Sequence, residues 1–167
     1  MRNWRTTWQL KDSALWLALI RIMVGWIFLQ SGWEKLANPA FAAGLPKTLA
    51  FFASKNPYPW MVNLLQTVAI PNAGFFALLF SWGELLVGLS LFFGILSQVG
   101  LLGALAMNLT FYFAAGWTSP STGSLSLLLI VASVVMFLAF AGKVLSIDQL
   151  WYHRFPKLLP WWPQPAA

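Results

Sequence analysis

Hydrophobic residues fill four long stretches of the chain, and polar residues gather between these stretches. Each stretch reaches or approaches the roughly 20 residues that a helix needs to cross a hydrocarbon core about 30 Å thick. The pattern therefore predicts an all-α integral membrane protein, a four-transmembrane-helix up-and-down bundle that forms a single domain over residues 1–167. The predicted transmembrane helices cover residues of about 14–36, 73–96, 99–117 and 124–142.

The connections between the last three predicted helices are short. Only Ser97 and Gln98 separate the second helix from the third, so we expect these two helices to form a tight antiparallel hairpin. Residues 116–123 are rich in Ser, Thr, Pro and Gly, which favour a turn before the fourth helix. Consecutive helices are therefore expected to run in opposite directions.

A much longer connection, residues 37–72, joins the first two predicted helices, and connections beyond about 12 to 15 residues usually have structure or function of their own. Asn38 followed by Pro39 fits an N-cap with proline at the first helical position, and Pro46 is expected to interrupt or restart that helix. A second short helix is expected over residues 61–70. We predict a partly helical external cap over the outer mouth of the bundle. The alternative is a pair of lipid-facing amphipathic helices that merely bridge the two spans.

Charged residues are few, and their placement sets the expected orientation. The composition, 59% hydrophobic and 8% charged, lies far outside the range of soluble domains, so the formal net charge of +6 indicates helix orientation and not a nucleic-acid partner. We expect both termini in the cytoplasm, and a bacterial or archaeal cytoplasmic-type membrane or an equivalent energy-transducing membrane. Basic residues that flank transmembrane helices are more frequent on the cytoplasmic side. On the side that we expect in the cytoplasm they are Arg2, Arg5, Lys11, Lys143, Arg154 and Lys157, and on the external side they are Lys35, Lys47 and Lys55.

A cleaved secretory signal is the alternative interpretation of the first apolar stretch. The chain starts with basic residues, and residues 40–42 resemble a small-residue cleavage site. The apolar region nevertheless exceeds the usual ~7 to 15 residues and contains an arginine, so we expect the first helix to be retained.

The end of the chain carries the pattern of a surface helix. Ser146 and Gln149 fit a capping box, which predicts a cytoplasmic surface helix over residues of about 147–156. Its apolar and basic sides are typical of a helix lying on an anionic leaflet. His153 belongs to this segment, and a single histidine without a second ligand is expected to be an interfacial side chain and not a metal site.

Two opposite charges, Arg21 and Glu84, each lie inside an apolar stretch. A central charge costs roughly 2.5 to 3.5 kcal/mol on insertion scales, so we expect the two side chains to face each other, with Asn108 completing their hydrogen bonds. The residues of this candidate polar pocket are Arg21, Glu84, Asn108 and Tyr112. Small or basic residues that share their helix faces are Gly25, Gly32, Lys35 and Gly88.

Two interpretations of this polar group stay open. It forms either a pocket that binds a quinone head group or a small anion or passes a proton, or a buried structural clasp that fixes helix register. The chain has no cysteine, which excludes disulfides, thiol chemistry and cysteine-ligated metal centres within it. It also offers no haem, flavin or metal motif. We expect no metal or covalently bound cofactor, and any redox centre must belong to a partner or a bound small molecule.

Three segments, residues 21–36, 83–89 and 141–148, together resemble the DoxX/DoxD family of four-span membrane proteins. The resemblance implies a four-helix bundle and, for the DoxD branch, the small membrane subunit of a thiosulfate:quinone oxidoreductase that passes electrons to membrane quinone. Other members are accessory proteins, including ones linked to oxidative-stress or thiol systems. The family motif carries over to Arg21, Gly25, Gly32, Lys35, Leu36, Glu84, Gly88, Ser146 and Asp148.

The leading hypothesis is a small membrane subunit of a quinone-linked electron-transfer assembly, which anchors the assembly or contributes to a quinone-side pocket and is not a complete oxidoreductase by itself. The alternative is a purely structural accessory subunit of a larger respiratory or photosynthetic complex. A solute or proton pathway would need a continuous polar lining, which Ser126 and Ser133 alone do not give the fourth helix. The expected partners are the lipid bilayer, other membrane or peripheral subunits, and a bound quinone or lipid.

Overall fold

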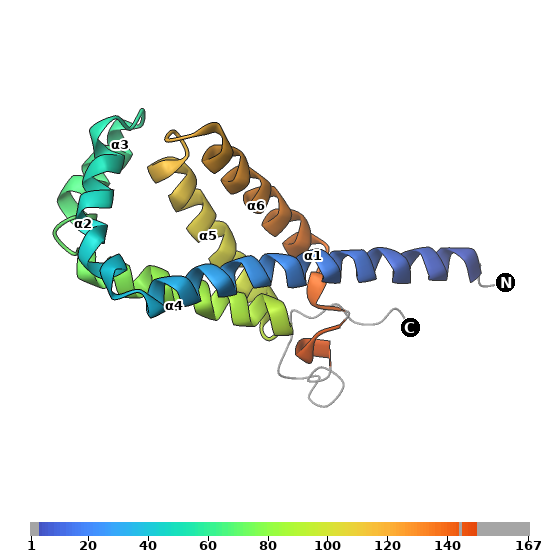
Figure 1. Ribbon diagram of the computed structural model, residues 1–167. Coiled ribbons are helices and arrows are strands. Elements are labelled where there is room, and N and C mark those ends of the chain that lie inside the picture. Colours follow the sequence, from blue (N-terminus) through green and yellow to red (C-terminus); the bar gives the residue numbers. More distant parts are fainter. Residues whose placement is uncertain (1–3, 144, 150–167) are drawn as a thin grey trace.

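The computed structural model describes the backbone of residues 4–143 and 145–149, and the side chains of residues 14–142 and 145–149 (Figure 1). All regular structure within these residues is helical, which confirms the predicted fold class. Four helices are long and apolar enough to cross a membrane. They are α1 (Trp4–Ala37, apolar from Ala14), α4 (Ala73–Phe93), α5 (Ser97–Ala115) and α6 (Pro120–Leu138).

The four long helices are arranged as two neighbouring pairs. Helix α1 crosses the whole view in Figure 1 with α4 beside it, and α5 and α6 form the second pair. We call the end where α1 leads into α2 the cap end, and the end that holds the turn between α4 and α5 the turn end. The first turns of α1 project beyond the other helices at the turn end.

Glycines bring the backbones of α1 and α4 into direct contact. A Cβ atom added to Gly88 would lie 2.5 Å from the backbone nitrogen of Leu29, and one added to Gly32 would lie 2.5 Å from that of Leu85. Gly25 lies equally close to α4 further along the same face. Any side chain at these positions would push the helices apart, so the glycines fix the register of α1 against α4.

The turn between α4 and α5 differs from the predicted one. Helix α4 ends at Phe93, and α5 begins at Ser97, so the predicted bounds of 73–96 and 99–117 are each shifted by a few residues. Gly94 closes α4 in the left-handed conformation, with φ of 68°, and Leu96 also has a positive φ of 50°. Two left-handed residues so close together reverse the chain within three residues.

The long connection folds into helices α2 (Pro39–Ser54) and α3 (Pro59–Leu64) and the π-helical segment η1 (Leu65–Ala69). The side chain of Asn38 caps α2 by accepting from the Ala40 amide at 3.0 Å. The expectation that Pro46 interrupts or restarts the helix is wrong, because α2 continues through it. The buried Leu45 and Leu49 on either side of the proline hold this part of α2 against the rest of the molecule, and this packing offsets the lost backbone hydrogen bond.

Two apolar cores hold the molecule together. The main core joins all four long helices through Val24, Phe28, Val87, Leu91, Leu101, Ala104, Leu129, Met136 and Ala141. The second core packs α2, α3 and η1 against α4 and α5 through Leu45, Leu49, Ala53, Met61, Leu65, Ala69, Ala73, Ala77 and Ala114. The second core shows that the helices of residues 39–69 pack on the bundle and do not only connect two spans.

Helix α6 is followed by the short 3-10 helix η2 (Ala141–Lys143), and residues 147–149 are helical. The Ser146 hydroxyl accepts from the Gln149 amide at 3.0 Å, as the first half of the predicted capping box requires. The rest of the predicted surface helix, including His153, lies outside the described residues.

Candidate functional site

Arg21 is fully buried at the turn end of the bundle. Its guanidinium donates to the backbone carbonyl of Ala141 at 3.1 Å and to that of Leu145 at 2.6 Å. The carboxylate of Asp148 interacts favourably with the same charge. Arg21 therefore joins α1 to the segment that follows α6, because its guanidinium donates to two backbone carbonyls of that segment.

Asp148 caps a helix that lies far from it in the sequence. Its two carboxylate oxygens accept from the backbone amides of Leu96 and Ser97, both at 2.7 Å, at the start of α5. Its own amide donates to the Gly94 carbonyl at 2.9 Å. The negative charge lies at the N-terminus of α5, where the helix dipole favours it. We call Arg21, Ser146 and Asp148, with their backbone partners, the turn-end latch.

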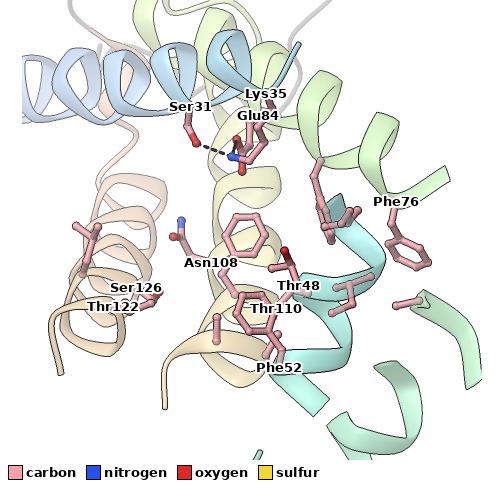
Figure 2. A pocket seen from close by; sticks show the side chains of 18 of the residues that line it. Ser31, Lys35, Thr48, Phe52, Phe76, Glu84, Asn108, Thr110, Thr122 and Ser126 are labelled. Atoms are coloured by element: carbon pink, nitrogen blue, oxygen red, sulfur yellow. Dashed lines mark hydrogen bonds and ion pairs between the residues drawn. The ribbon is translucent and has the colours of Figure 1, made fainter. Parts of the chain in front are cut away.

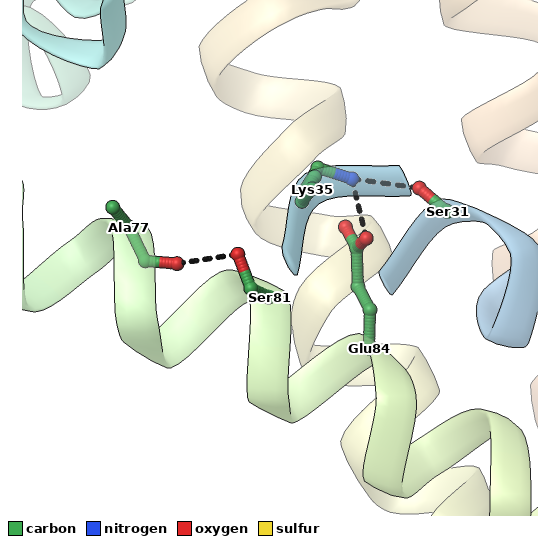
Figure 3. A network of polar contacts seen from close by, with 5 residues as sticks. All are labelled: Ser31, Lys35, Ala77, Ser81 and Glu84. Atoms are coloured by element: carbon green, nitrogen blue, oxygen red, sulfur yellow. Dashed lines mark hydrogen bonds and ion pairs between the residues drawn. The ribbon is translucent and has the colours of Figure 1, made fainter. Parts of the chain in front are cut away.

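Glu84 lies in α4 toward the cap end, and only 2% of it is exposed. The Lys35 ammonium of α1 forms an ion pair with the Glu84 carboxylate and donates a second hydrogen bond to the Ser31 hydroxyl at 2.6 Å (Figure 3). The Lys35 side chain is 24% exposed. Nearby, the Ser81 hydroxyl donates back to the Ala77 carbonyl of its own helix and does not join the pair.

The predicted pairing of Arg21 with Glu84 is therefore wrong, and the cause is the register of α1 against α4. Arg21 lies beside Gly94, where an added Cβ would be 2.9 Å from its Nη1. Glu84 precedes Gly94 by ten residues, which is about 15 Å along a helix and beyond the reach of an arginine. A count from the ends of the two apolar stretches places the two charges too close, because those ends do not lie side by side. Gly25 contacts Phe92 near the end of α4, so the apolar residues of α1 before Arg21 extend past that end.

A cavity of about 550 Å³ lies between the cap and the long helices (Figure 2). Its wall is mostly apolar and includes Phe28, Phe41, Leu45, Leu49, Phe52, Met61, Leu65, Phe76, Phe80, Phe111, Leu125 and Leu129. The polar side chains in the wall are Ser31, Lys35, Thr48, Glu84, Asn108, Thr110, Ser121, Thr122 and Ser126. The π-helical segment contributes Leu65 and Ala69, so the cap forms part of the wall.

Part of the polar wall lies near the ion pair. Figure 2 shows Ser31, Lys35 and Glu84 together at one side, with Asn108 of α5 between them and Ser126 of α6 in this view. Asn108 is 3% exposed, and its amide nitrogen donates to the Ala104 carbonyl at 2.8 Å. We call Ser31, Lys35, Glu84 and Asn108 the polar end of the cavity.

Of the four residues predicted for a polar pocket, the structure brings together two, Glu84 and Asn108. Arg21 belongs to the turn-end latch. Tyr112 lines a separate hollow of about 280 Å³ beside Tyr58 and Trp117. Whether any of the four binds a ligand stays a prediction.

Lys35 is the cavity residue whose role the sequence reasoning missed. The sequence pattern places it with Gly25, Gly32 and Gly88 as a residue that shares a helix face with the predicted pocket, and those three glycines do lie at the contact of α1 with α4. The same stripe of α1 carries Arg21 at one end and Lys35 at the other. Had the glycines been used to align the two antiparallel helices, Lys35 would have been placed opposite Glu84.

The fold and site define a four-span membrane helix bundle with a largely apolar cavity and an ion pair in its wall. The DoxX family model matches residues 16–117, more than half of the chain, and the protein belongs to the DoxX family. The matched region runs from α1 to the end of α5 and contains the whole polar end of the cavity. No solved structure matches the chain.

Proposed function

We propose that this chain is a small membrane subunit that binds a lipid-soluble molecule of the quinone class in its cavity, as part of a quinone-linked electron-transfer assembly. The observation that carries the proposal is the cavity itself, with apolar walls and a single gathering of charged and amide groups. Its volume of about 550 Å³ is in the range of pockets that hold small organic ligands.

The lining suits a flat polar ring attached to an apolar chain. The aromatic and aliphatic wall supplies contact area for the ring and for the first part of an isoprenoid tail. The ammonium of Lys35 has three N–H groups, and the recorded hydrogen bonds use two of them, to Glu84 and Ser31. The third is free to donate to an oxygen of the head group.

Membership of the DoxX family supports a membrane role, and resemblance to the DoxD branch supplies the electron-transfer context of the proposal. Under this proposal the chain does not transfer electrons through a centre of its own. It holds the ligand where partner subunits deliver or collect electrons.

The test is to purify the protein in mild detergent and to identify its bound lipids and partner proteins by mass spectrometry. We expect quinone in the native sample and loss of quinone, with unchanged helix content, in Lys35→Met. The matched control is Lys47→Met, because Lys47 is exposed on α2 and does not line the cavity. Stoichiometric partner proteins without quinone, and no binding of added short-chain quinone, would instead identify a structural accessory subunit.

A further inference from the structure

The polar end of the cavity offers hydrogen-bond acceptors that the protein does not use. Lys35 binds one carboxylate oxygen of Glu84, Oε2. For the other oxygen, Oε1, the structure records no hydrogen bond within the described residues. Glu84 lines the cavity and is 2% exposed, so a molecule in the cavity is the partner that this oxygen can reach.

Asn108 adds a second acceptor to the same wall. Its amide nitrogen is engaged by the Ala104 carbonyl at 2.8 Å, one turn earlier on α5. This bond uses one of the two N–H groups of the amide and orients the side chain, and no hydrogen bond to its carbonyl oxygen is recorded in the part of the chain that the structure describes. A carboxylate oxygen and an amide oxygen both require a donor.

We propose that the cavity selects a ligand whose head group carries a hydroxyl, such as a phenol or a hydroquinone, over the corresponding carbonyl or ether. The proposal rests on the proposed function, because it specifies the head group of the ligand that the cavity binds. The hydroxyl donates to Glu84 Oε1 or to the Asn108 amide oxygen, and its own oxygen accepts from Lys35. A quinone has only acceptors, so its binding leaves both protein oxygens unpaired in an apolar cavity.

The reduced form of a quinone is therefore expected to bind more tightly than the oxidised form. A site built to pair with a hydroxyl discriminates against an analogue without one because its buried polar groups then lose their partners. We expect a difference in Kd of roughly tenfold or more. The protein would thus favour hydroquinone over quinone within the bilayer.

The test uses three probes that differ only in the head group: a 4-alkylphenol, its methyl ether and a quinone with the same alkyl chain. Their dissociation constants are measured by calorimetry on the full chain in lipid nanodiscs, with helix content followed by circular dichroism. The phenol is expected to bind roughly tenfold more tightly than either analogue. In Asn108→Leu this ratio should fall, whereas Asn63→Leu should keep it, because Asn63 is exposed on α3 and does not line the cavity.

The outcomes separate this inference from the function on which it rests. If the quinone or the methyl ether binds as tightly as the phenol, the selection of a hydroxyl is wrong while binding in the cavity stands. If no probe binds the folded native protein, the proposed function fails, and the selectivity fails with it. The comparison of the three probes on the native protein needs no variant, so it still tests the inference if Asn108→Leu does not fold.

Discussion

Each end of the bundle buries a basic and an acidic side chain, and the two ends use them differently. At the turn end, the hydrogen bonds recorded for Arg21 and Asp148 all involve backbone groups. At the cap end, the hydrogen bonds recorded for Lys35 go to the side chains of Glu84 and Ser31, and its ammonium lies 5.8 Å from the centre of the Phe41 ring. Backbone partners are fixed by the helices that carry them, whereas side-chain partners can rotate and can be replaced by a ligand.

The surroundings of the two ends match this difference. Arg21 is fully buried among packed segments, and its planar guanidinium spans two carbonyls at once. Lys35 is 24% exposed and lines a cavity, and its ammonium has a donor to spare. The comparison indicates that the turn end holds helices together, and there the buried Arg21 Nε and Ser97 Oγ have no partner among the described residues. At the cap end, Glu84 and Asn108 line a cavity, where a ligand can reach their side-chain oxygens.

The largest expected effect comes from breaking the turn-end latch. Arg21→Met leaves the carbonyls of Ala141 and Leu145 without their donor and leaves Asp148 without its neighbouring positive charge. We expect the free energy of unfolding to fall by about 3 to 5 kcal/mol, as it does when one member of a buried charged group is removed. The measurement is denaturant unfolding in detergent micelles.

The control for this change is Lys47→Met, which removes an exposed positive charge and should leave stability within about 0.5 kcal/mol of the native value. The ligand affinity of the folded fraction of Arg21→Met should also be unchanged. A loss of affinity at full stability would place Arg21 in the binding site and would contradict the separation of the two ends.

The next largest effect on stability is expected at the contact of Gly88 with Leu29, which sets the register of α1 against α4. Gly88→Ala places a Cβ 2.5 Å from the Leu29 backbone nitrogen, so α1 and α4 must separate, at a cost of about 1 to 3 kcal/mol. Gly74→Ala is the matched control, because a Cβ there meets nothing within 4 Å, and it should be neutral or slightly stabilising. Thermal unfolding of both variants would show the difference, and equal midpoints would mean that the helices are not held in this register.

The smallest effect on stability is expected at the ion pair of the cavity. Lys35→Met leaves Glu84 without its ion-pair partner, but Glu84 lines a cavity that can hold water, so we expect a loss of about 1 to 2 kcal/mol. The double variant Lys35→Met with Glu84→Gln should recover part of this loss, because no uncompensated charge remains. A double variant that loses as much stability as the two single variants together would show that the two side chains do not stabilise each other, and would contradict the ion pair.

Much of the fold could be predicted from the sequence because the signals for it are local. A long apolar run identifies a transmembrane helix, and Asn38 and Ser146 each cap a helix that starts at the next residue. The register between two packed helices cannot be read from the local sequence of either helix. It depends on close backbone contacts such as that of Gly88 with Leu29, and the apolar runs do not show where those contacts fall.

The site was predicted less well for the same reason. Glu84 and Asn108 were recognised because a polar residue inside an apolar helix is conspicuous, whereas Lys35 lies at the end of its helix, where basic residues are common. The role of Asp148 at the start of α5 had no local signal, since residues 96 and 97 contain no side chain that caps the helix. The prediction of a helix break at Pro46 was wrong because the packing of the neighbouring Leu45 and Leu49 outweighs the tendency of proline to end a helix.

The cap of α5 also bears on how the protein is made. The amide of Ser97 is paired with a carboxylate 51 residues further along the chain. A ribosome adds Asp148 only after α5 and α6 have been synthesised, so the start of α5 has no cap until then. The turn between α4 and α5 can therefore be completed only once the segment that follows α6 has been made and has folded back against it.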